Sequence, residues 1–167
     1  MLRTLSIIVC LDRNNGIGKN GKIPWDNPID LKYFRVVTTG SGHNVVIMGR
    51  KTWDSLSKRP LGSRINIILS KCRDVEEDIK TFDNVHHCRN KSDCLSLISG
   101  MVGVDNVFVI GGAEIYNEFM ENCNKLYLSR LDDCFDCDVF FKFMSSQWKK
   151  ISVVKKDRLS FEIWDKV

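Results

Sequence analysis

Short apolar runs that alternate with helix-forming segments constrain the fold of this 167-residue chain more than any other feature. The run from Leu5 to Leu11 is short and rich in β-branched residues, which favours a strand buried on both faces. Further runs predict strands at 45–48, 65–69, 107–110 and 125–131. Helices are expected from Pro28 to about residue 38, after Gly49, at 92–100 and at 113–120. Strands that alternate with helices predict a mostly parallel sheet with right-handed crossovers.

The C-terminal part of the chain follows a different pattern. Residues 148–156 and 159–166 alternate in polarity and are separated by a turn, which predicts a closing antiparallel hairpin. Residues 74–90 have weak periodicity, and only a short strand at 85–87 is expected there. No internal repeat, low-complexity segment or linker interrupts the sequence. The sequence therefore predicts a single α/β domain over residues 1–167.

Two glycine junctions follow buried strands. Gly49 precedes two cations, Arg50 and Lys51, whereas Gly111-Gly112 follows the strand at 107–110. Cations in a first helical turn oppose the helix dipole, so they favour an anion bound at that point. In mostly parallel sheets, ligands lie at the carboxyl ends of the strands, where both junctions fall. The second junction, Gly111-Gly112, does not form G-x-G-x-x-G, and tight packing of helix on strand explains it equally well.

One stretch near the N-terminus offers an ionisable group in apolar surroundings. Asn27 is a preferred N-cap and Pro28 suits the first helical position, which places Asp30 in the first turn. Phe34 lies one turn further on the same face, and Leu31 is expected to share its apolar stripe. Burial raises the pKa of a carboxyl group and a helix N-terminus lowers it, so Asp30 is a candidate proton-handling residue. The alternative is a solvated acid that only favours the helix dipole.

The polar loop at 12–22 precedes this stretch directly. It contains three glycines and three asparagines, which is too polar for the core and too rich in glycine for a helix. Its position next to Trp25 and Asp30 makes it a candidate lid over a binding site. A plain connector is the alternative.

Charge and composition restrict the partners of the chain. Lys and Arg exceed Asp and Glu by 25 to 21, a modest formal charge of +4 that is spread along the sequence. This argues against a nucleic-acid-binding stripe and leaves small anions as ligands. No apolar run reaches the length of a membrane-spanning helix, and the N-terminus lacks a secretory pattern. A cytoplasmic protein is expected.

The seven cysteines are an odd number, and we interpret them as reduced thiols. Cys134 and Cys137 form a C-x-x-C, which suits a redox pair or half of a zinc site. The only other cluster of zinc-ligand residue types is His86-His87-Cys88, and nothing in the sequence brings the two together. Two ordinary thiols in a loop are the simpler interpretation, and no metal site is predicted.

Five motifs follow one another in order over nearly the whole chain. They are Gly18 with Pro24-Trp25 and Asp30, Val46 to Trp53, Asn66 to Ser70, Ile110 to Gly112 with Ile115-Tyr116, and Lys125 to Leu128. Together they resemble dihydrofolate reductases, and an aspartate at position 30 and the compact length resemble the bacterial type. The resemblance implies an eight-stranded, mostly parallel sheet and NADPH-dependent reduction of 7,8-dihydrofolate to tetrahydrofolate, in support of one-carbon and thymidylate metabolism. It also implies a monomer that antifolate inhibitors bind.

The resemblance assigns substrate-site residues at matching positions. Asp30 would hold the pteridine ring, Trp25 would place an ordered water, and Ser129 would hydrogen-bond the carboxylate where threonine is usual. Phe34 and Leu56 would line the aryl pocket. The remaining substrate contacts would be the backbone carbonyls of Ile8 and Ile110 and a bidentate pair between Arg64 and the glutamate α-carboxylate.

The resemblance also implies a cofactor site. Arg50, Lys51 and Lys71 would surround the phosphates, and the absence of a ribose-binding acid favours NADPH over NADH. The cofactor-binding residues would be Cys10, Ile17, Gly18, Gly49, Arg50, Lys51, Thr52, Ser70, Lys71, Gly111, Gly112, Ala113, Glu114, Ile115 and Tyr116.

Two positions depart from the family pattern without removing a required chemical group. Ile23 stands where methionine is frequent, and Cys10 stands where a small residue is usual. The three histidines, His43, His86 and His87, are expected on the surface.

Two other functions fit part of the pattern. A related pterin or pyrimidine reductase of the riboflavin-pathway type explains the glycine junctions, but it gives no reason for Trp25, Asp30, Phe34 and Arg64 together. A non-catalytic nucleotide-binding protein could keep the same fold.

Overall fold

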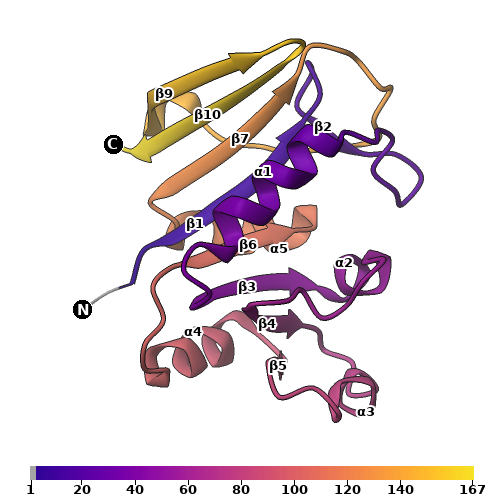
Figure 1. Ribbon diagram of the computed structural model, residues 1–167, viewed down its shortest axis with the longest axis vertical. Coiled ribbons are helices and arrows are strands. Elements are labelled where there is room, and N and C mark those ends of the chain that lie inside the picture. Colours follow the sequence, from indigo (N-terminus) through magenta and orange to yellow (C-terminus); the bar gives the residue numbers. More distant parts are fainter. Residues whose placement is uncertain (1–2) are drawn as a thin grey trace.

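The computed structural model describes residues 3–167 and shows the predicted mixed sheet (Figure 1). Its strands are β1 (Leu5–Leu11), β3 (Asn44–Gly49), β4 (Arg64–Leu69), β5 (Val85–Cys88), β6 (Val107–Gly111), β7 (Lys125–Leu131), β9 (Trp148–Lys156) and β10 (Leu159–Lys166). They form one eight-stranded sheet in the order β5-β4-β3-β6-β1-β7-β10-β9. A separate pair joins β2 (Gly16–Gly18) to β8 (Val139–Phe140).

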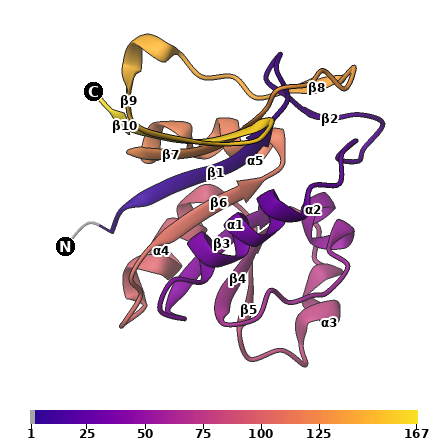
Figure 2. The same ribbon diagram turned by 45° about the horizontal axis from the view of Figure 1, so that its top comes forward.

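The sheet is parallel except at its C-terminal edge. β1 pairs in parallel with β6 and β7, and β3 does so with β4 and β6. β10 runs antiparallel to β7 and to β9, which forms the predicted hairpin at one end of the sheet (Figures 1 and 2). The first strand of the chain therefore lies inside the sheet and holds its two parallel neighbours together.

Helices cover both faces of the sheet. They are α1 (Pro28–Thr39), α2 (Arg50–Ser55), α3 (Val75–Ile79), α4 (Lys91–Gly100) and α5 (Ala113–Phe119), with short 3₁₀ turns at Met120–Asn122 and Ser145–Gln147. One apolar core packs α4 and α5 against alternate residues of the strands, including Ile7 and Ile47. A second core lies on the opposite face under α1, α2 and α3, and it includes Ile8, Val46 and Trp53. This alternation explains why the parallel strands are nearly continuous apolar runs.

Some local predictions were wrong, each for a physical reason. Helix α3 was not predicted because only Val75 and Ile79 in its five residues are buried. Helix α4 begins at Lys91, one residue before the expected start, because Asn90 caps it by accepting from the Asp93 N–H at 2.8 Å. Leu31 does not share an apolar stripe with Phe34, because its side chain is 59% exposed.

No helix within residues 3–167 combines the length and the apolar character that a bilayer span requires.

Candidate active site

The N-terminus of α1 forms as the sequence predicts. Asn27 caps the helix by accepting a hydrogen bond from the Asp30 N–H at 3.1 Å, and Pro28 occupies the first turn. The cap satisfies a backbone donor that would otherwise be unpaired at a helix start. Asp30 is thereby held on the first turn of a helix that crosses the sheet (Figure 1).

The Asp30 carboxylate lies over two hydrogen-bonding side chains of the sheet. Cys10 on β1 and Ser129 on β7 are direct partners in the strand register, and both side chains lie close enough to Asp30 to favour its charged form as hydrogen-bond donors. Burial raises the pKa of Asp30 above its ordinary value, although these two side chains oppose that shift. Of the two interpretations of Asp30, the solvated acid that only favours the helix dipole therefore has less support than the candidate proton-handling residue.

Cys10, which the resemblance assigns to the cofactor site, also lies beside the candidate proton-handling residue. Its thiol is next to Asp30 and Trp25. Burial, followed by the neighbouring Asp30 charge, raises the pKa of Cys10 far above its ordinary value. The group therefore stays a neutral thiol beside the Asp30 carboxylate and the Trp25 indole. The structure thus brings Trp25, Asp30 and Cys10 together, with Ser129 on the neighbouring strand.

Replacing Cys10 with alanine should raise the pKa of Asp30 further, because one donor to the charged form is lost. We expect the Asp30-dependent limb of the pH–rate profile to move to higher pH, and Cys10→Ser, which keeps a donor, to restore it. The matched control is Cys123→Ala, because Cys123 is also a buried thiol, with its pKa raised to about 12 by burial, on the other face of the sheet. An unchanged profile in Cys10→Ala would contradict the hydrogen bond's role.

The apolar part of the site lies along α1. Phe34 and Leu56 are half-buried and pack against the same core, as expected for residues that line one pocket. Tyr33 stacks on Phe161 with ring centroids 4.1 Å apart, and burial raises the pKa of Tyr33 to about 12. The helix is therefore fixed to the sheet through this stacked pair.

Arg64 is a buried cation without a carboxylate partner in the described part of the chain. Its Nε donates to the Gly62 carbonyl at 2.8 Å, and its Nη1 donates to the Thr38 hydroxyl at 2.9 Å. Burial lowers the pKa of Arg64, and the nearby charge of Arg35 lowers it further. An anion would fit beside this guanidinium, because a nearby negative charge would offset the effects of burial and of Arg35 on its pKa.

The two glycine junctions meet at the carboxyl edge of the sheet. Met48, next to Gly49, is the register partner of Gly111, and a Cβ on Gly49 would lie 3.1 Å from the Ile115 side chain. Gly111 has φ of 124°, which favours glycine, and a Cβ there would lie 3.2 Å from the Tyr116 hydroxyl. The Thr52 hydroxyl is 3.9 Å from the Cβ position of Gly112. The predicted convergence of both junctions is confirmed.

Tyr116 lies behind this edge and is almost fully buried. Its hydroxyl is 2.9 Å from the Ile8 carbonyl oxygen and 2.8 Å from that of Ile110, so its single proton is shared between two acceptors. Burial, with the nearby charge of Asp30, raises the pKa of Tyr116 well above the ordinary value. The two carbonyls that the resemblance assigned to ligand contact are therefore close together, and a buried hydroxyl positions them.

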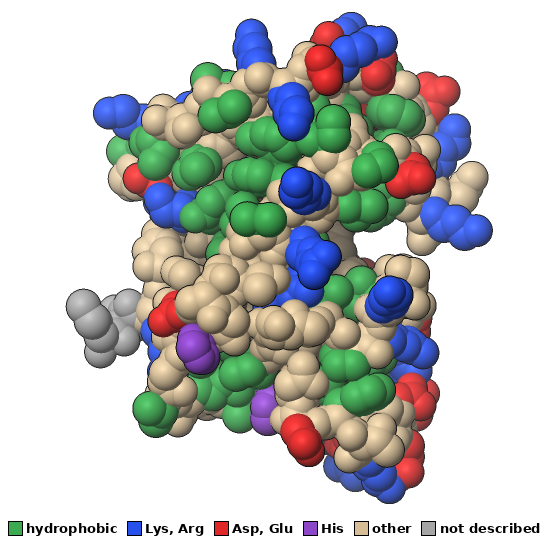
Figure 3. All heavy atoms as spheres, in the orientation of Figure 1, with side chains coloured by type: hydrophobic (Ala, Val, Ile, Leu, Met, Phe, Trp, Pro, Cys, Tyr) green, Lys and Arg blue, Asp and Glu red, His purple; other side chains and the backbone are tan. Residues whose placement is uncertain are grey.

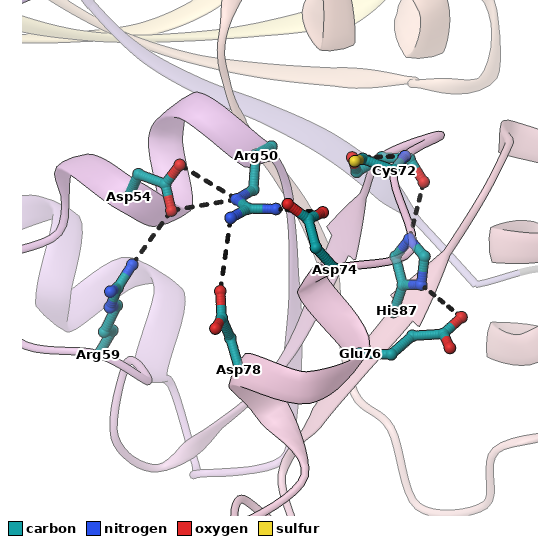
Figure 4. Close-up of polar contacts among 9 residues, drawn as sticks. Arg50, Asp54, Arg59, Cys72, Asp74, Glu76, Asp78 and His87 are labelled. Atoms are coloured by element: carbon teal, nitrogen blue, oxygen red, sulfur yellow. Dashed lines mark hydrogen bonds and ion pairs between the residues drawn. The ribbon is translucent and has the colours of Figure 1, made fainter.

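The cations expected around the cofactor phosphates are arranged differently from the prediction. Lys51 and Lys71 are exposed, whereas Arg50 is bound to carboxylates of Asp54, Asp74 and Asp78 (Figure 4). Arg50 opens a helix of only six residues, so the ion pairs explain a cation there without a bound anion. Ser70 follows β4, and its hydroxyl accepts from the Cys72 N–H at 3.2 Å.

Sequence reasoning missed Asp12, which organises the candidate lid. Its buried carboxylate accepts from the N–H groups of Gly16 at 2.7 Å, Asn14 at 2.8 Å and Phe135 at 3.1 Å. Burial raises the pKa of Asp12, but these hydrogen bonds outweigh it and leave the pKa below the ordinary value. An aspartate two residues before Asn14-Asn15-Gly16 is a turn signal that could have indicated part of this network.

The candidate lid also contains β2, which carries two predicted site residues. Ile17 packs against the core under α4 and α5, and Gly18 pairs with Val139 of β8. The surface is hollowed between the segment that carries β2 and helix α2 (Figure 3). A hollow of about 510 Å³ borders Trp25, while a larger one of about 950 Å³, near Phe141 and Trp148, contains none of the predicted site residues.

The histidines and cysteines carry no second site among the described residues. His87 was expected on the surface, but its side chain is 5% exposed and contacts Glu76 and the Ser70 carbonyl. Cys134 and Cys137 are free thiols, and a Cβ on Gly16 would lie 2.5 Å from the Cys137 sulfur. Within residues 3–167, no three potential metal-ligating side chains come together.

The fold and the candidate site define an α/β protein with two glycine junctions at the carboxyl edge of a mostly parallel sheet and a half-buried carboxylate on the helix that crosses it. Residues 4–162 match the sequence model of a family described as dihydrofolate reductase. The chain belongs to the dihydrofolate reductase family.

Individual relatives agree with this assignment. A dihydrofolate reductase of Candida albicans is 40% identical over 156 residues, which cover 86% of this chain and 78% of the relative. A bifunctional dihydrofolate reductase-thymidylate synthase of Daucus carota is 39% identical over 153 residues, which cover 85% of this chain. The chain spans only 26–33% of the length of the bifunctional plant relatives that it matches.

A solved structure supports the fold independently. A dihydrofolate reductase from Enterococcus faecalis, complexed with NADP(H) and RAB-propyl, matches with a TM-score of 0.79 and 28% sequence identity. The match covers 98% of this chain and 96% of that chain. Because the sequence relatives named above come from a yeast and a plant, the likeness to the bacterial type remains an interpretation of Asp30 and the compact length.

Proposed function

We propose that this chain catalyses the NADPH-dependent reduction of 7,8-dihydrofolate to 5,6,7,8-tetrahydrofolate. The observation that carries the proposal is the half-buried Asp30 carboxylate on the first turn of α1, beside the Cys10 and Ser129 side chains of the sheet. Asp30 would bind the pteridine through its amino and ring N–H groups and favour protonation of the ring nitrogen. A carboxyl group whose pKa is raised toward neutrality suits that function.

The remaining substrate contacts follow from the geometry along α1. Phe34 and Leu56 would enclose the aryl ring, and the buried Arg64 guanidinium would bind the terminal α-carboxylate. Trp25 would help to place an ordered water at the Asp30 side of the ring. Together they would orient a long, flat, anionic molecule with one end at Asp30 and the other at Arg64.

The residues at the sheet edge fit a dinucleotide cofactor. Gly111 leaves no room for a side chain, and Thr52 faces Gly112, so the backbone there can approach a ligand closely. Lys51 and Lys71 would bind phosphate groups, while Ile17, Gly18 and the start of α5 at Ala113 and Glu114 would border the nicotinamide side. When bound, NADPH supplies the hydride. The chain's own residues hold the two rings together, exclude water and provide a fixed charge.

The test is the loss of NADPH absorbance at several concentrations of dihydrofolate, with NADH alongside. We expect turnover that saturates with dihydrofolate and a lower KM for NADPH than for NADH. A pterin or a pyrimidine of the riboflavin-pathway type should be a poor substrate, because it cannot use Arg64. Tight NADPH binding without any dihydrofolate turnover would refute the reductase activity and favour a non-catalytic nucleotide-binding protein.

We also propose that the chain acts as a monomer in a reducing, cytosol-like compartment, and that antifolate inhibitors compete for the site at Asp30. All seven cysteines lie within the described residues as free thiols, which agrees with a reducing environment. Sedimentation in the presence and absence of reductant tests the first statement. A mass of twice 19.2 kDa under reducing conditions would contradict it.

A further inference from the structure

The strongest feature outside the substrate site is an ion-pair network around Arg50, at the start of α2. Its Nε lies 3.1 Å from Asp54, its Nη1 lies 3.0 Å from Asp74 and its Nη2 lies 3.4 Å from Asp78. Figure 4 shows the guanidinium between these three carboxylates. All three guanidinium nitrogens therefore face an acid of the same chain.

The network is more negative than positive. Arg59 adds a second cation, 3.2 Å from Asp54, so two guanidinium charges stand against three carboxylates. The Cys72 thiol and Arg50 keep the pKa of Asp74 below its ordinary value, so this acid is charged at neutral pH. A dianionic phosphate near Arg50 would meet donors that are already occupied and a small excess of negative charge.

The network lies next to the two exposed lysines of the proposed cofactor site. Lys51 follows Arg50 directly on α2, and Lys71 lies on the segment that joins β4 to Asp74. The Arg50–Asp74 pair thus joins the two segments that carry Lys51 and Lys71. Asp74 lies just before α3, and Asp78 lies within it. Both acids are therefore on a different part of the chain from Arg50, which begins α2.

We propose that Asp74 and Asp78 are specificity-determining residues, which hold the Arg50 guanidinium in ion pairs and thereby weaken the chain's preference for NADPH over NADH. The proposal rests on the proposed function, in which the 2′-phosphate of NADPH lies by Lys51 and Lys71. NADH lacks that phosphate, so the acids should not affect its binding. Release of Arg50 would add a bidentate, charge-assisted phosphate contact.

The test is equilibrium binding of NADPH and NADH to the full chain, followed by quenching of tryptophan fluorescence. In the double variant Asp74→Asn/Asp78→Asn, we expect the Kd for NADPH to fall about three- to tenfold, the size of one or two exposed ion pairs. The Kd for NADH should stay unchanged. The gain should disappear in an Arg50→Gln background and shrink at about 1 M salt, where the Debye length is near 3 Å.

Glu77→Gln is the matched control, because Glu77 is an exposed acid of the same helix that pairs with Lys80. It should leave both dissociation constants unchanged, and thermal melting should show that every variant is folded. An unchanged Kd for NADPH, an equal gain for NADH, or a gain that persists without Arg50 would overturn the proposal. If the parent chain binds NADH and NADPH equally well and the double variant binds NADPH no more tightly, Asp74 and Asp78 do not determine the specificity. Nucleotide binding would then still hold. If it binds neither nucleotide, the proposed function fails, and this inference fails with it.

Discussion

Asp30→Asn should lower turnover at neutral pH by about 10²–10⁴-fold, the usual contribution of general acid assistance. Asparagine keeps the shape of the side chain and can still accept from Ser129 and Cys10, but it has no charge. The variant should therefore fold and bind NADPH. The loss should shrink as the pH falls, because solution acid can then protonate the substrate. The measurement is the pH dependence of the hydride-transfer step in both forms.

The same variant should be more stable than the parent at neutral pH. The pKa of Asp30 is raised in the folded chain, so that chain binds more protons than the unfolded chain between the ordinary value of 3.8 and the raised one. Stability then falls as the pH rises through this window, and the loss is complete above it. The Asp30→Asn variant lacks this penalty, so its melting temperature should be higher at pH 7, with no such advantage below about pH 3.8.

Asp26→Asn is the control, because Asp26 is an exposed acid just before the helix cap. It should change neither turnover nor the pH profile. Full activity of Asp30→Asn at neutral pH would leave Asp30 as an ordinary helix-start acid and would remove the observation on which the proposed reductase activity rests.

Arg64→Ala should raise the KM for dihydrofolate much more than the KM for a pteridine that lacks the glutamate. Removing one partner of a buried charge pair costs about 2–5 kcal/mol. Because Arg64 is only 8% exposed, we expect the cost of losing its pair with the substrate carboxylate to lie in the upper part of that range. The comparison of the two substrates measures the effect of the carboxylate alone.

Arg64→Lys separates charge from geometry, since lysine keeps the cation but loses the planar fork. Its KM for dihydrofolate should lie between those of the parent and the alanine variant. Melting temperatures are needed because the alanine variant also loses the contacts to Gly62 and Thr38. An equal loss for both substrates would mean that Arg64 only stabilises the fold.

The strands were predictable because burial on both faces leaves a strong apolar signal. The bounds of β1 and β7 agree with the sequence to the residue, and the cap at Asn27 follows from local chemistry alone. The helix face was less predictable. Leu31 is apolar yet exposed, because only Thr38 of α1 is buried and the helix leaves much of one side uncovered.

The candidate site was predictable only where its chemistry is local. Asp30 was found from its own helix, but the contact of Cys10 with it depends on the crossing of α1 over the sheet. Asp12 binds the N–H of Phe135, and Arg50 binds acids 24 and 28 positions away. Contacts between residues so far apart in the sequence leave no spacing pattern, so they became visible only in the three-dimensional structure.

The place of β1 in the sheet has a consequence for the synthesis of the chain. β1 is made first, yet both of its neighbours come late, and its earliest pair joins Leu5 to Val107. At about 5–20 residues per second, a ribosome needs roughly 5–20 s to cover that separation. During this time a seven-residue apolar strand has neither of its backbone edges paired. The nascent chain therefore depends on keeping this segment from other chains until β6 emerges, and a fragment that ends before Val107 should aggregate.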